Sequence, residues 1–591
     1  MPADTIPRRL FEQAKARPDA PAYHEKRGSL WVPTSYAEYA REVRRAARAM
    51  IALGLAPGQT VCILGFNRAE WVIFDVAAMA AGAAPAGVYT TCSKEEVQYI
   101  VHHAEAPIVL VESRDQWDKI DKERARMPHL RHVVMMRGPD LPDDPLVLSW
   151  EAFLAKGDAV AESEVDARTD ALEPAGLATL IYTSGTTGPP KGVMLSHGNL
   201  AWTAGSARDL VGGSAADRSV SYLPLSHIAE QMFSVHGCIT MGSSIYFAES
   251  ILALADNIKE VRPTVFFGVP RIWEKFHAGV AGKMAAATGV KAKLAGWARR
   301  VGTEVTNLRN RGEQPTGLLA LQYALANKLV FSKLKAALGL DQARICISGA
   351  APISQEIIEF FASLDLSILE VYGQSEDTGP TTFNWPGRVR YGTVGQRLPG
   401  VEVKIAEDGE ILVRGPNVFL GYYKEPEATR EALVDGWLCS GDLGAFDREG
   451  FLTITGRKKD IIITAGGKNV APKNIEAALK NHPLVAEAVV IGDRRKFLTA
   501  LIALDPELSA KWMTERGAVG PAHASKPVRE ELQRAVDEIN ATLARVETVK
   551  KFAVLERPLS IEDGELTPTL KVKRKKVNEH FAKVIEAMYA E

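Results

Sequence analysis

The sequence contains little cysteine and gives no sign of a disulfide framework. Its 591 residues include five cysteines, which are Cys62, Cys92, Cys238, Cys346 and Cys439. The number is odd, the spacing is wide, and no pair has the short separation typical of a metal site. We therefore predict a protein of a reducing compartment.

An excess of charge of either sign is also missing. The 71 lysines and arginines balance the 72 aspartates and glutamates, which leaves a formal net charge of -1. Without a basic field, the composition argues against a nucleic-acid partner. Repeats and low-complexity tracts are absent as well. The length and the 46% hydrophobic content predict a large core and two or more domains.

Long hydrophobic runs are missing too. The longest extends from Val76 to Tyr89 and is interrupted by Gly82 and Pro85. A membrane-spanning helix needs roughly 20 apolar residues, so we interpret this run as a buried helix followed by a strand. The first residues, Met1 to Thr5, lack the apolar core of a signal peptide. These features predict a cytoplasmic protein that lies, at most, peripherally on the inner face of a membrane.

What the sequence does contain is an alternation of apolar strands and amphipathic helices. The predicted strands are Thr60–Gly65, Pro107–Val111, Arg344–Ser348 and Leu366–Tyr372. Ser35 with Glu38, and Ser93 with Glu96, have the spacing of capping boxes at helix starts, and Asn67 is expected to open another helix. Strands alternating with helices indicate an α/β fold with a helix-covered sheet.

The pattern changes after about Gly400. Hairpins are predicted at Val401–Arg414, turning at Asp408–Gly409, and at Phe446–Thr455, turning at Glu449–Gly450. A smaller α+β unit follows, with strands at 486–491 and 498–504 and a helix at Glu530–Arg545. We expect a large domain at 1–458 and a small domain at 459–591. The segment from Lys283 to Lys333 is rich in Ala, Leu and Lys, and it predicts helices with little chemical content.

The stretch from Tyr182 to Gly192 is the strongest candidate for a binding loop. It joins two apolar segments that read as strands, and it contains three glycines, four Ser and Thr hydroxyls, and Lys191. Glycines allow close approach of the backbone, so such a loop suits a nucleotide triphosphate. The alternative is an ordinary surface turn. A Walker loop is excluded because Pro190 and Gly192 replace its second glycine and its Ser or Thr.

Three further motifs carry candidate side chains. Glu376 follows the strand that ends at Tyr372, where a carboxylate can hold Mg²⁺ against phosphate oxygens. Asp442 ends Gly436–Asp442, and its carboxylate can accept two ribose hydroxyls. Lys571 lies in a basic run from Gly564 to Lys576. Each also has an ordinary interpretation, as an acid at a strand end, a turn aspartate or a solvated basic surface.

Together, these motifs resemble those of the adenylate-forming superfamily. Ser221–Gln231 and Val269–Lys275 are similar to long-chain fatty acyl-CoA synthetases, and Leu64–Trp71 and Ile462–Asn469 to their bubblegum-type branch. The resemblance extends from about Ser35 to Lys576. The sequence departs from the superfamily motif Tyr-Gly-x-Thr-Glu at one position, where Ser375 replaces the threonine and keeps its hydroxyl.

The resemblance implies the fold and the roles of individual residues. The fold would be a large domain with helix-covered sheets and a small barrel-like part, joined to a mobile α+β domain. Catalytic roles fall to Lys571, Glu376 and Thr186, and Glu376 holds magnesium. Binding of ATP and CoA falls to Thr183, Ser184, Gly185, Thr186, Thr187, Gly188, Lys191, Gly349, Ala350, Ala351, Pro352, Tyr372, Gly373, Gln374, Ser375, Glu376, Asp442, Arg457, Gly466, Gly467 and Lys571.

Two assignments keep an alternative at this point. His227 either borders the acyl site or is a core histidine with satisfied hydrogen bonds. Lys459 occupies the hinge position of relatives, although Gly456–Asp460 taken alone reads as a solvated charged turn. Lys573 to Lys576 are surface lysines and arginines, with CoA phosphates or lipid headgroups as candidate partners.

The expected activity is that of a long-chain fatty acid–CoA ligase, with ATP, Mg²⁺ and coenzyme A as the small molecules involved. The acid is first joined to AMP with release of pyrophosphate, and the acyl group then passes to CoA. One alternative sends the acyl group to a carrier protein or to oxygen. Another is a non-catalytic acyl- or nucleotide-binding relative, which would be expected to lack Lys571, Glu376 or Asp442, and all three are present.

Overall fold

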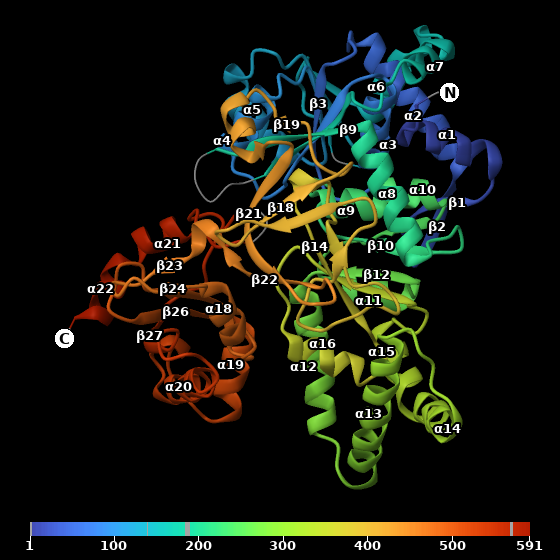
Figure 1. The fold of residues 1–591 in the computed structure, drawn as a ribbon. Helices are drawn as coiled ribbons and strands as arrows, with labels where there is room; N and C mark the ends of the chain where they lie inside the picture. The colour runs from blue at the N-terminus through green and yellow to red at the C-terminus, as the bar shows by residue number, and fades with distance from the viewer. Residues whose placement is uncertain (1–2, 139, 184–188, 568–570, 591) are drawn as a thin grey trace.

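The computed structural model describes residues 3–138, 140–183, 189–567 and 571–590. Figure 1 shows a large N-terminal domain and a smaller C-terminal domain beside it, coloured orange to red. Both domains combine helices with β-sheets, as the alternation in the sequence predicts. The predicted fold class is therefore confirmed.

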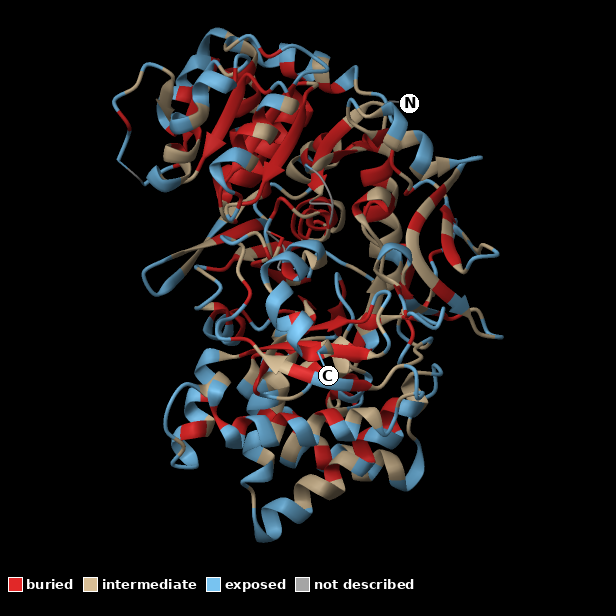
Figure 2. Ribbon diagram, turned by 90° about the vertical axis from the view of Figure 1, so that its left-hand side faces the viewer, coloured by how far each residue is buried: buried red, intermediate tan, exposed pale blue. Residues whose placement is uncertain are grey.

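The largest sheet has eight strands in the order β19-β9-β8-β4-β3-β5-β6-β7. Their bounds are β3 Thr60–Leu64, β4 Ala84–Val88, β5 Ile108–Val111, β6 His132–Met135, β7 Val147–Ser149, β8 Leu177–Thr183, β9 Lys191–Ser196 and β19 Gly421–Tyr422. Strands β3 to β5 are buried at every residue, and Figure 2 shows the strands of this sheet in red beneath exposed helices. Because both faces are covered, these strands are apolar throughout instead of alternating.

The helices of the N-terminal domain cover the sheets. They are α1 Ile6–Ala16, α2 Tyr36–Ala52, α3 Ala69–Ala80, α4 Lys94–His103, α5 Arg114–Glu123, α6 Trp150–Lys156, α7 Glu162–Asp170, α8 His197–Val211, α9 Ile228–Gln231, α10 Gly237–Met241, α11 Leu254–Val261, α12 Pro270–Ala285, α13 Gly289–Arg309, α14 Gly317–Ala326, α15 Ser332–Leu338, α16 Gln355–Ala362 and α17 Pro426–Ala432. The capping box of α4 is complete, whereas at α2 the Ser35 side chain accepts from Glu38 N alone.

The expected helix start at Asn67 is wrong. Helix α3 begins at Ala69, and the Asn67 side chain instead donates to Ser221 Oγ at 2.7 Å and to the Leu223 carbonyl at 2.6 Å. An asparagine favours a helix N-terminus only when its side chain is free to cap the backbone. Here the amide is used to join two distant segments of the core.

A second, five-stranded sheet has the order β12-β13-β14-β15-β16. Its strands are β12 Val265–Gly268, β13 Ile345–Ser348, β14 Ile368–Tyr372, β15 Thr382–Phe383 and β16 Gln396–Arg397. Strands β12, β13 and β14 are parallel, so their carboxyl ends lie at one edge. A four-stranded sheet next to it consists of β10 Arg218–Ser221, β11 Ser244–Phe247, β1 Pro21–Arg27 and β2 Leu30–Ser35.

The part expected to be barrel-like is a five-stranded antiparallel sheet. It contains β17 Glu402–Ile405, β18 Glu410–Arg414, β20 Leu433–Val434, β21 Trp437–Phe446 and β22 Leu452–Arg457. Both predicted hairpins are present, and the glycines at their turns have positive φ, +86° at Gly409 and +82° at Gly450. A glycine adopts this conformation without steric cost.

The C-terminal domain has its own sheets and its own core. Its elements are β23 Ile462–Ile463, β24 Asn469–Val470, α18 Pro472–Lys480, β25 Val485–Ile491, β26 Leu498–Leu504, α19 Pro506–Glu515, α20 Lys526–Asn540, β27 Val549–Val554, α21 Arg574–His580 and α22 Ala582–Tyr589. Its two hydrophobic clusters contain no described residue before Ile462. The helix predicted at Glu530–Arg545 starts and ends earlier in the structure. At its end, the Asn540 side chain exchanges hydrogen bonds with the backbone of Val549.

Among the described residues, three side-chain polar contacts join the two domains. Arg271 reaches Asp505 at 3.2 Å, Asn481 Nδ2 donates to Ser354 Oγ at 3.2 Å, and Lys573 lies 4.0 Å from Glu96. Exposed pairs of this kind contribute about 0–1 kcal/mol each. This arrangement of the domains is therefore held by weak contacts.

Candidate active site

The candidate site begins at the carboxyl end of β14. Tyr372 is the last residue of that strand, and Ser375 and Glu376 lie in the short 3₁₀ turn that follows. The residue after Tyr372 must be a glycine, because a Cβ on Gly373 would lie 1.5 Å from the carbonyl oxygen of Gly379. The tight turn directs Gln374 and Glu376 to the edge of the sheet, where open α/β sheets bind ligands.

Asp442 is held at the same edge by three side chains. Its Oδ2 accepts a hydrogen bond from Tyr372 Oη at 3.0 Å and one from Gln374 Nε2 at 2.8 Å. Arg457 Nε lies 3.6 Å from Oδ1, and the two residues are register partners on β21 and β22. Burial raises the pKa of Tyr372, so its hydroxyl stays protonated and donates. The structure thus brings four of the predicted residues together.

Lys191 and Glu376 are connected through a residue that the sequence analysis missed. The Tyr422 hydroxyl donates to Glu376 Oε1 at 2.8 Å, and the Lys191 ammonium lies 4.9 Å from the centre of the Tyr422 ring. Burial, with Glu376 adding to it, raises the pKa of Tyr422 and keeps its proton in place. No motif marked Tyr422, and the antiparallel pairing of β19 with β9 that places it here is a long-range feature.

The ends of the glycine-rich loop are paired with each other. Thr183 and Lys191 are register partners of β8 and β9, so the loop between them begins and ends at one point of the large sheet. The predicted phosphate donors within the loop stay predictions, because they lie outside the described residues; they are Ser184, Gly185, Thr186, Thr187 and Gly188.

The segment from Gly349 to Pro352 follows β13 and lies beside the end of β14. A Cβ on Gly349 would be 2.5 Å from Val371 Cγ1, and Ala350 has a positive φ of 67°. Glu370, one strand over, is the register partner of Ser348. Burial raises the pKa of Glu370 to about 8, and the sequence analysis did not single out this carboxyl.

Lys571 enters this region from the C-terminal domain. Its amide donates to Thr567 Oγ1 at 3.0 Å. Desolvation lowers the pKa of the Lys571 side chain, Arg457 and Lys473 lower it further, and Asp442 and Glu376 act in the opposite direction. The side chain still has exposed surface. Charges of both domains thus act on the exposed Lys571 side chain, and we call the region around Lys571, Asp442, Glu376 and Arg457 the recess.

His227 is half-buried, and the charge of Lys571 acts on it. Its Nδ1 accepts from the amide of Ala229 at 3.1 Å, which caps the short helix α9. Burial, together with Lys571, lowers the pKa of His227 to about 4, so the imidazole is neutral at physiological pH. The ring thus has the structural hydrogen bond that the core interpretation expects, and its position at the acyl site stays a prediction.

Two predicted groups are not brought into the recess. Gly466 and Gly467 form an exposed turn between β23 and β24, with φ of +70° at Gly467. Lys459 is exposed in the short 3₁₀ turn Lys458–Asp460, at the junction of the domains.

A divalent cation fits the site only with a substrate to complete its ligands. Among the described residues, no group of three or more His, Cys, Asp or Glu side chains could hold a metal ion. Glu376 offers a half-buried carboxylate. Asp377 next to it is buried, accepts from Gln374 N and Thr381 Oγ1, and has its pKa raised to about 8 by burial. Mg²⁺ commonly binds through one or two carboxylates plus phosphate oxygens and water.

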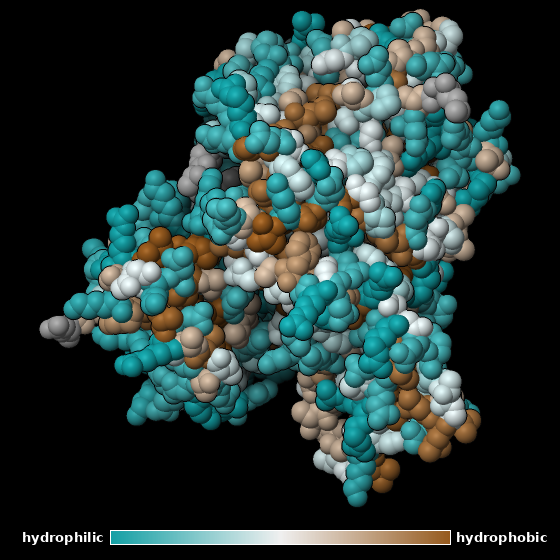
Figure 3. All heavy atoms as spheres, in the orientation of Figure 1, coloured by the Kyte–Doolittle hydropathy of each residue, from teal (hydrophilic) through white to brown (hydrophobic). Residues whose placement is uncertain are grey.

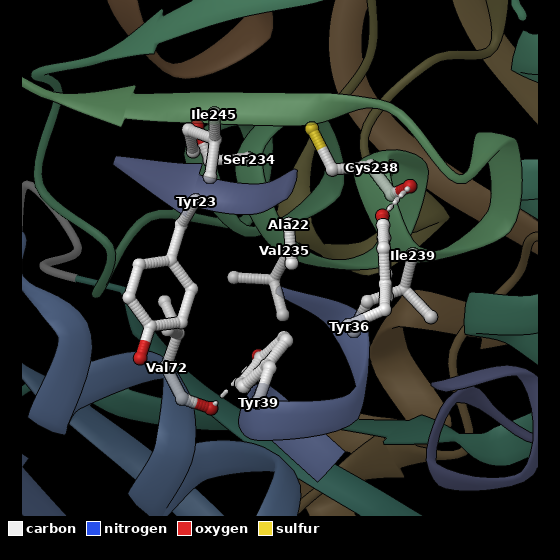
Figure 4. Close-up of a pocket in the computed structure, with 10 residues that line it drawn as sticks. All are labelled: Ala22, Tyr23, Tyr36, Tyr39, Val72, Ser234, Val235, Cys238, Ile239 and Ile245. Atoms are coloured by element: carbon white, nitrogen blue, oxygen red, sulfur yellow. Dashed lines mark hydrogen bonds between the residues drawn. The ribbon is translucent and has the colours of Figure 1, made fainter. Parts of the chain in front are cut away.

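Other hollows contain none of these residues. A cavity of about 10 Å³ in the N-terminal core, lined by Tyr23, Tyr36 and Tyr39, has room for one water at most, and Figure 4 shows their rings packed around it. A surface pocket of about 490 Å³ on the C-terminal domain is lined by α19 and residues 555–558. Within the described ranges, no helix is long and apolar enough to cross a bilayer.

Comparison with known proteins identifies the family of the chain. The family described as AMP-binding enzyme matches residues 10–423, and its C-terminal domain matches residues 459–591. The long-chain-fatty-acid–CoA ligase ACSBG2 of Xenopus laevis is 38% identical over 626 residues, which cover 100% of this chain and 84% of that protein. The long-chain-fatty-acid–CoA ligase FadD15 of Mycobacterium tuberculosis is 38% identical over 598 residues, with 99% and 97% covered.

Solved structures share the fold. The anthranilate CoA ligase AuaEII in complex with anthranoyl-AMP has a TM-score of 0.72 at 20% identity, covering 99% of this chain and 98% of that one. The A domain of carboxylic acid reductase from Segniliparus rugosus, in complex with AMP and a co-purified carboxylic acid, has a TM-score of 0.74 at 21% identity, covering 99% and 94%. The predicted resemblance is confirmed, and the chain belongs to the AMP-binding enzyme family.

Proposed function

We propose that the protein is an ATP-dependent, AMP-forming long-chain fatty acid–CoA ligase. The observation that carries the proposal is that Lys571 comes from the C-terminal domain and is within reach of the charges of Asp442, Glu376 and Arg457 of the N-terminal domain. The names of relatives that are 38% identical over nearly the whole chain support the long-chain substrate and CoA as the acceptor.

We assign the nucleotide to the region between the carboxyl ends of β13 and β14 in the five-stranded sheet and the end of β8 in the large sheet. Asp442 accepts the ribose hydroxyls, Arg457 contacts the ribose or α-phosphate, and Gly349 to Pro352 lie against the adenine. Tyr372, Gly373, Gln374 and Ser375 form the floor. The loop from Thr183 to Lys191, including Ser184, Gly185, Thr186, Thr187 and Gly188, surrounds the β- and γ-phosphates. The hydrogen bonds that orient Asp442 support this assignment.

Glu376 is the residue that would hold Mg²⁺, with phosphate oxygens as the other ligands. The bound ion supplies positive charge against the triphosphate. Tyr422 orients the carboxylate through its hydroxyl, as its 2.8 Å hydrogen bond indicates.

In the first half-reaction, a carboxylate oxygen of the fatty acid attacks the α-phosphorus of ATP. The bond from that phosphorus to the bridging oxygen breaks, and pyrophosphate leaves with the electron pair. Negative charge accumulates between the two substrates, and the Lys571 ammonium offsets it. Removing one such electrostatic donor costs about 10²- to 10³-fold in rate in other enzymes.

In the second half-reaction, the CoA sulfur attacks the acyl carbon of acyl-AMP. The carbon–oxygen bond to AMP breaks, and the thiol proton passes to water. We place the domain boundary at 458/459, with Lys459 as the hinge, and propose that rotation there withdraws Lys571 and presents Gly466 and Gly467. The separate cores of the two domains and the weak contacts between them support this.

Lys571→Ala tests both the site and the two-step account. We expect pyrophosphate release from ATP, oleate and Mg²⁺ to fall by about 10²- to 10³-fold, while thioester formation from supplied oleoyl-AMP and CoA survives. Lys583→Ala is the control, because this lysine is exposed on α22 and forms no ion pair among the described residues. Equal loss in both half-reactions would refute the assignment of Lys571.

The acceptor needs a separate measurement. Product analysis with and without CoA distinguishes a CoA ligase from an enzyme that hands acyl-AMP to a carrier protein or to oxygen. We expect oleoyl-CoA and AMP to form in equal amounts. Accumulation of acyl-AMP despite saturating CoA would exclude CoA as the acceptor.

A further inference from the structure

Helix α14 shows hydrophobic side chains on both sides. Its ten residues, Gly317–Ala326, contain no charged side chain. One face packs on α13, where Ala326 and Phe331 are buried with Leu319 and Tyr323 beside them. A helix that is apolar all round is normally buried all round.

The outer face of α14 is exposed. Leu318 and Leu321 are each 70% exposed, Leu325 is 50% exposed, and Leu329 in the turn that follows is 36% exposed. The spacing of three and four residues places all four on one stripe, which we call the leucine stripe. In Figure 3 hydrophobic residues gather at the lower right of the molecule, where Figure 1 labels α14.

The surroundings of the leucine stripe are basic. Residues 283 to 335 contain ten lysines and arginines and two glutamates, in a chain whose formal net charge is -1. Lys328 and Lys333 are exposed and lie on either side of Leu329 in sequence, at the end of the stripe. Among the described residues, no acidic side chain forms an ion pair with Lys328, Lys333, Lys291 or Lys293. The positive charge of these four lysines is thus left without local compensation.

We propose that the leucine stripe and these lysines dock the protein onto an anionic lipid bilayer. Apolar side chains that point outward beside unpaired lysines match the boundary between acyl chains and charged headgroups, where interfacial helices lie. A protein partner would have to be both apolar and acidic at this face, whereas an anionic bilayer supplies both properties. The proposal does not depend on the reaction catalysed, since α14 contributes nothing to the recess around Lys571.

The test is flotation of the full chain with lipid vesicles. We expect binding to vesicles of equal parts phosphatidylcholine and phosphatidylglycerol, and no binding to phosphatidylcholine alone. Since a basic residue near an anionic surface contributes about fivefold in affinity, Lys328→Ala and Lys333→Ala should each weaken binding by about that factor. High salt should do the same, because the attraction is screened within about 10 Å at 0.1 M salt.

Two variants separate the contribution of the leucine stripe to vesicle binding from the effect of adding a charge anywhere on the surface. Leu318→Glu with Leu321→Glu should reduce vesicle binding at least tenfold, because two charges would enter the acyl region. Val519→Glu is the matched control, since Val519 is 94% exposed but lies on the C-terminal domain. All these positions are exposed and outside the recess, so pyrophosphate release without vesicles should be unchanged.

Absence of binding to phosphatidylglycerol vesicles would overturn the proposal, and so would binding that the leucine and lysine variants leave unchanged. Analytical ultracentrifugation tests the alternative that a second copy of the chain binds to the leucine stripe. A dimer that Leu321→Glu dissociates, without vesicle binding by the native chain, would assign the leucine stripe to self-association and refute lipid docking.

Discussion

Tyr422 gives the most direct test of how the recess is organised. Its hydroxyl donates to Glu376 Oε1 at 2.8 Å, while its ring lies 4.9 Å from the Lys191 ammonium and packs edge-on against Phe419 at 5.0 Å. Tyr422→Phe removes the hydroxyl alone and keeps both ring contacts. The substitution thus isolates the orientation of one carboxylate.

The magnitude follows from the kind of hydrogen bond that is lost. A hydrogen bond to a charged group contributes about 1.5–3 kcal/mol, and partners that orient a metal ligand affect metal affinity or activity by about 10- to 100-fold. We expect the Mg²⁺ concentration for half-maximal pyrophosphate release to rise by about 10- to 100-fold in Tyr422→Phe. At saturating Mg²⁺ most of the rate should return.

The measurement is a Mg²⁺ titration of pyrophosphate release at saturating ATP and oleate, with the melting temperature recorded in parallel. Tyr423→Phe is the matched control, because the neighbouring ring packs against His103 and makes no contact with Glu376. If Tyr422→Phe has the Mg²⁺ dependence of the native enzyme, Glu376 does not hold the metal in the way we propose. A rate loss that no Mg²⁺ concentration relieves would contradict the reasoning equally.

Three further predictions concern the core and the domain contact. Burial raises the pKa of Glu230 to about 7, so between pH 4.5 and 7 the folded state keeps a proton that the unfolded state has lost. The free energy of unfolding should therefore fall by up to about 3 kcal/mol as the pH rises through this range. In Glu230→Gln, thermal melts should no longer show this dependence on pH. Gly349→Ala places a Cβ 2.5 Å from Val371 Cγ1, so it should lower the free energy of unfolding by about 1–3 kcal/mol and raise the KM for ATP. Gly279→Ala is the control, because its helix position is open and the substitution should leave stability unchanged or increase it. Arg271→Ala breaks the 3.2 Å contact with Asp505 and should slow pyrophosphate release by up to about fivefold, without slowing thioester formation from acyl-AMP. Lys275→Ala, one helical turn away, is the control. Equal rates of pyrophosphate release in the two variants would count against a role of the domain contact.

Several of the site residues that the sequence predicts lie in or beside a loop at the end of a strand. Parallel strands end at a common edge, so Tyr372, Glu376 and Gly349 converge whatever the details of packing. Asp442 and Arg457 are neighbours because they are partners on a hairpin. Local signals of this kind are readable from sequence.

What the sequence does not predict depends on contacts between distant segments. Tyr422 is 46 positions from Glu376, and nothing local marks its hydroxyl as a donor to that carboxylate. Asn67 is a good helix-capping residue whose amide is used elsewhere, 154 positions away. The periodicity of α14 predicts a helix correctly, but periodicity cannot tell which of two apolar faces finds a partner. That question is decided by the packing of α13, which covers one face only.

The linker between the domains is anchored on both sides of Lys459, the residue that we propose as the hinge. Lys458 is held to the N-terminal domain by Asp408 at 2.6 Å and Glu410 at 2.8 Å. Asp460 is held to the C-terminal domain by Lys473 at 3.5 Å. Lys459 lies between these two anchors, is exposed, and forms no ion pair among the described residues. Because the anchors fix the backbone on either side, we expect a rotation of the small domain to be concentrated in the dihedral angles of Lys459. With Lys571 in the recess and Gly466 and Gly467 outside it, we infer that this arrangement serves the adenylation step.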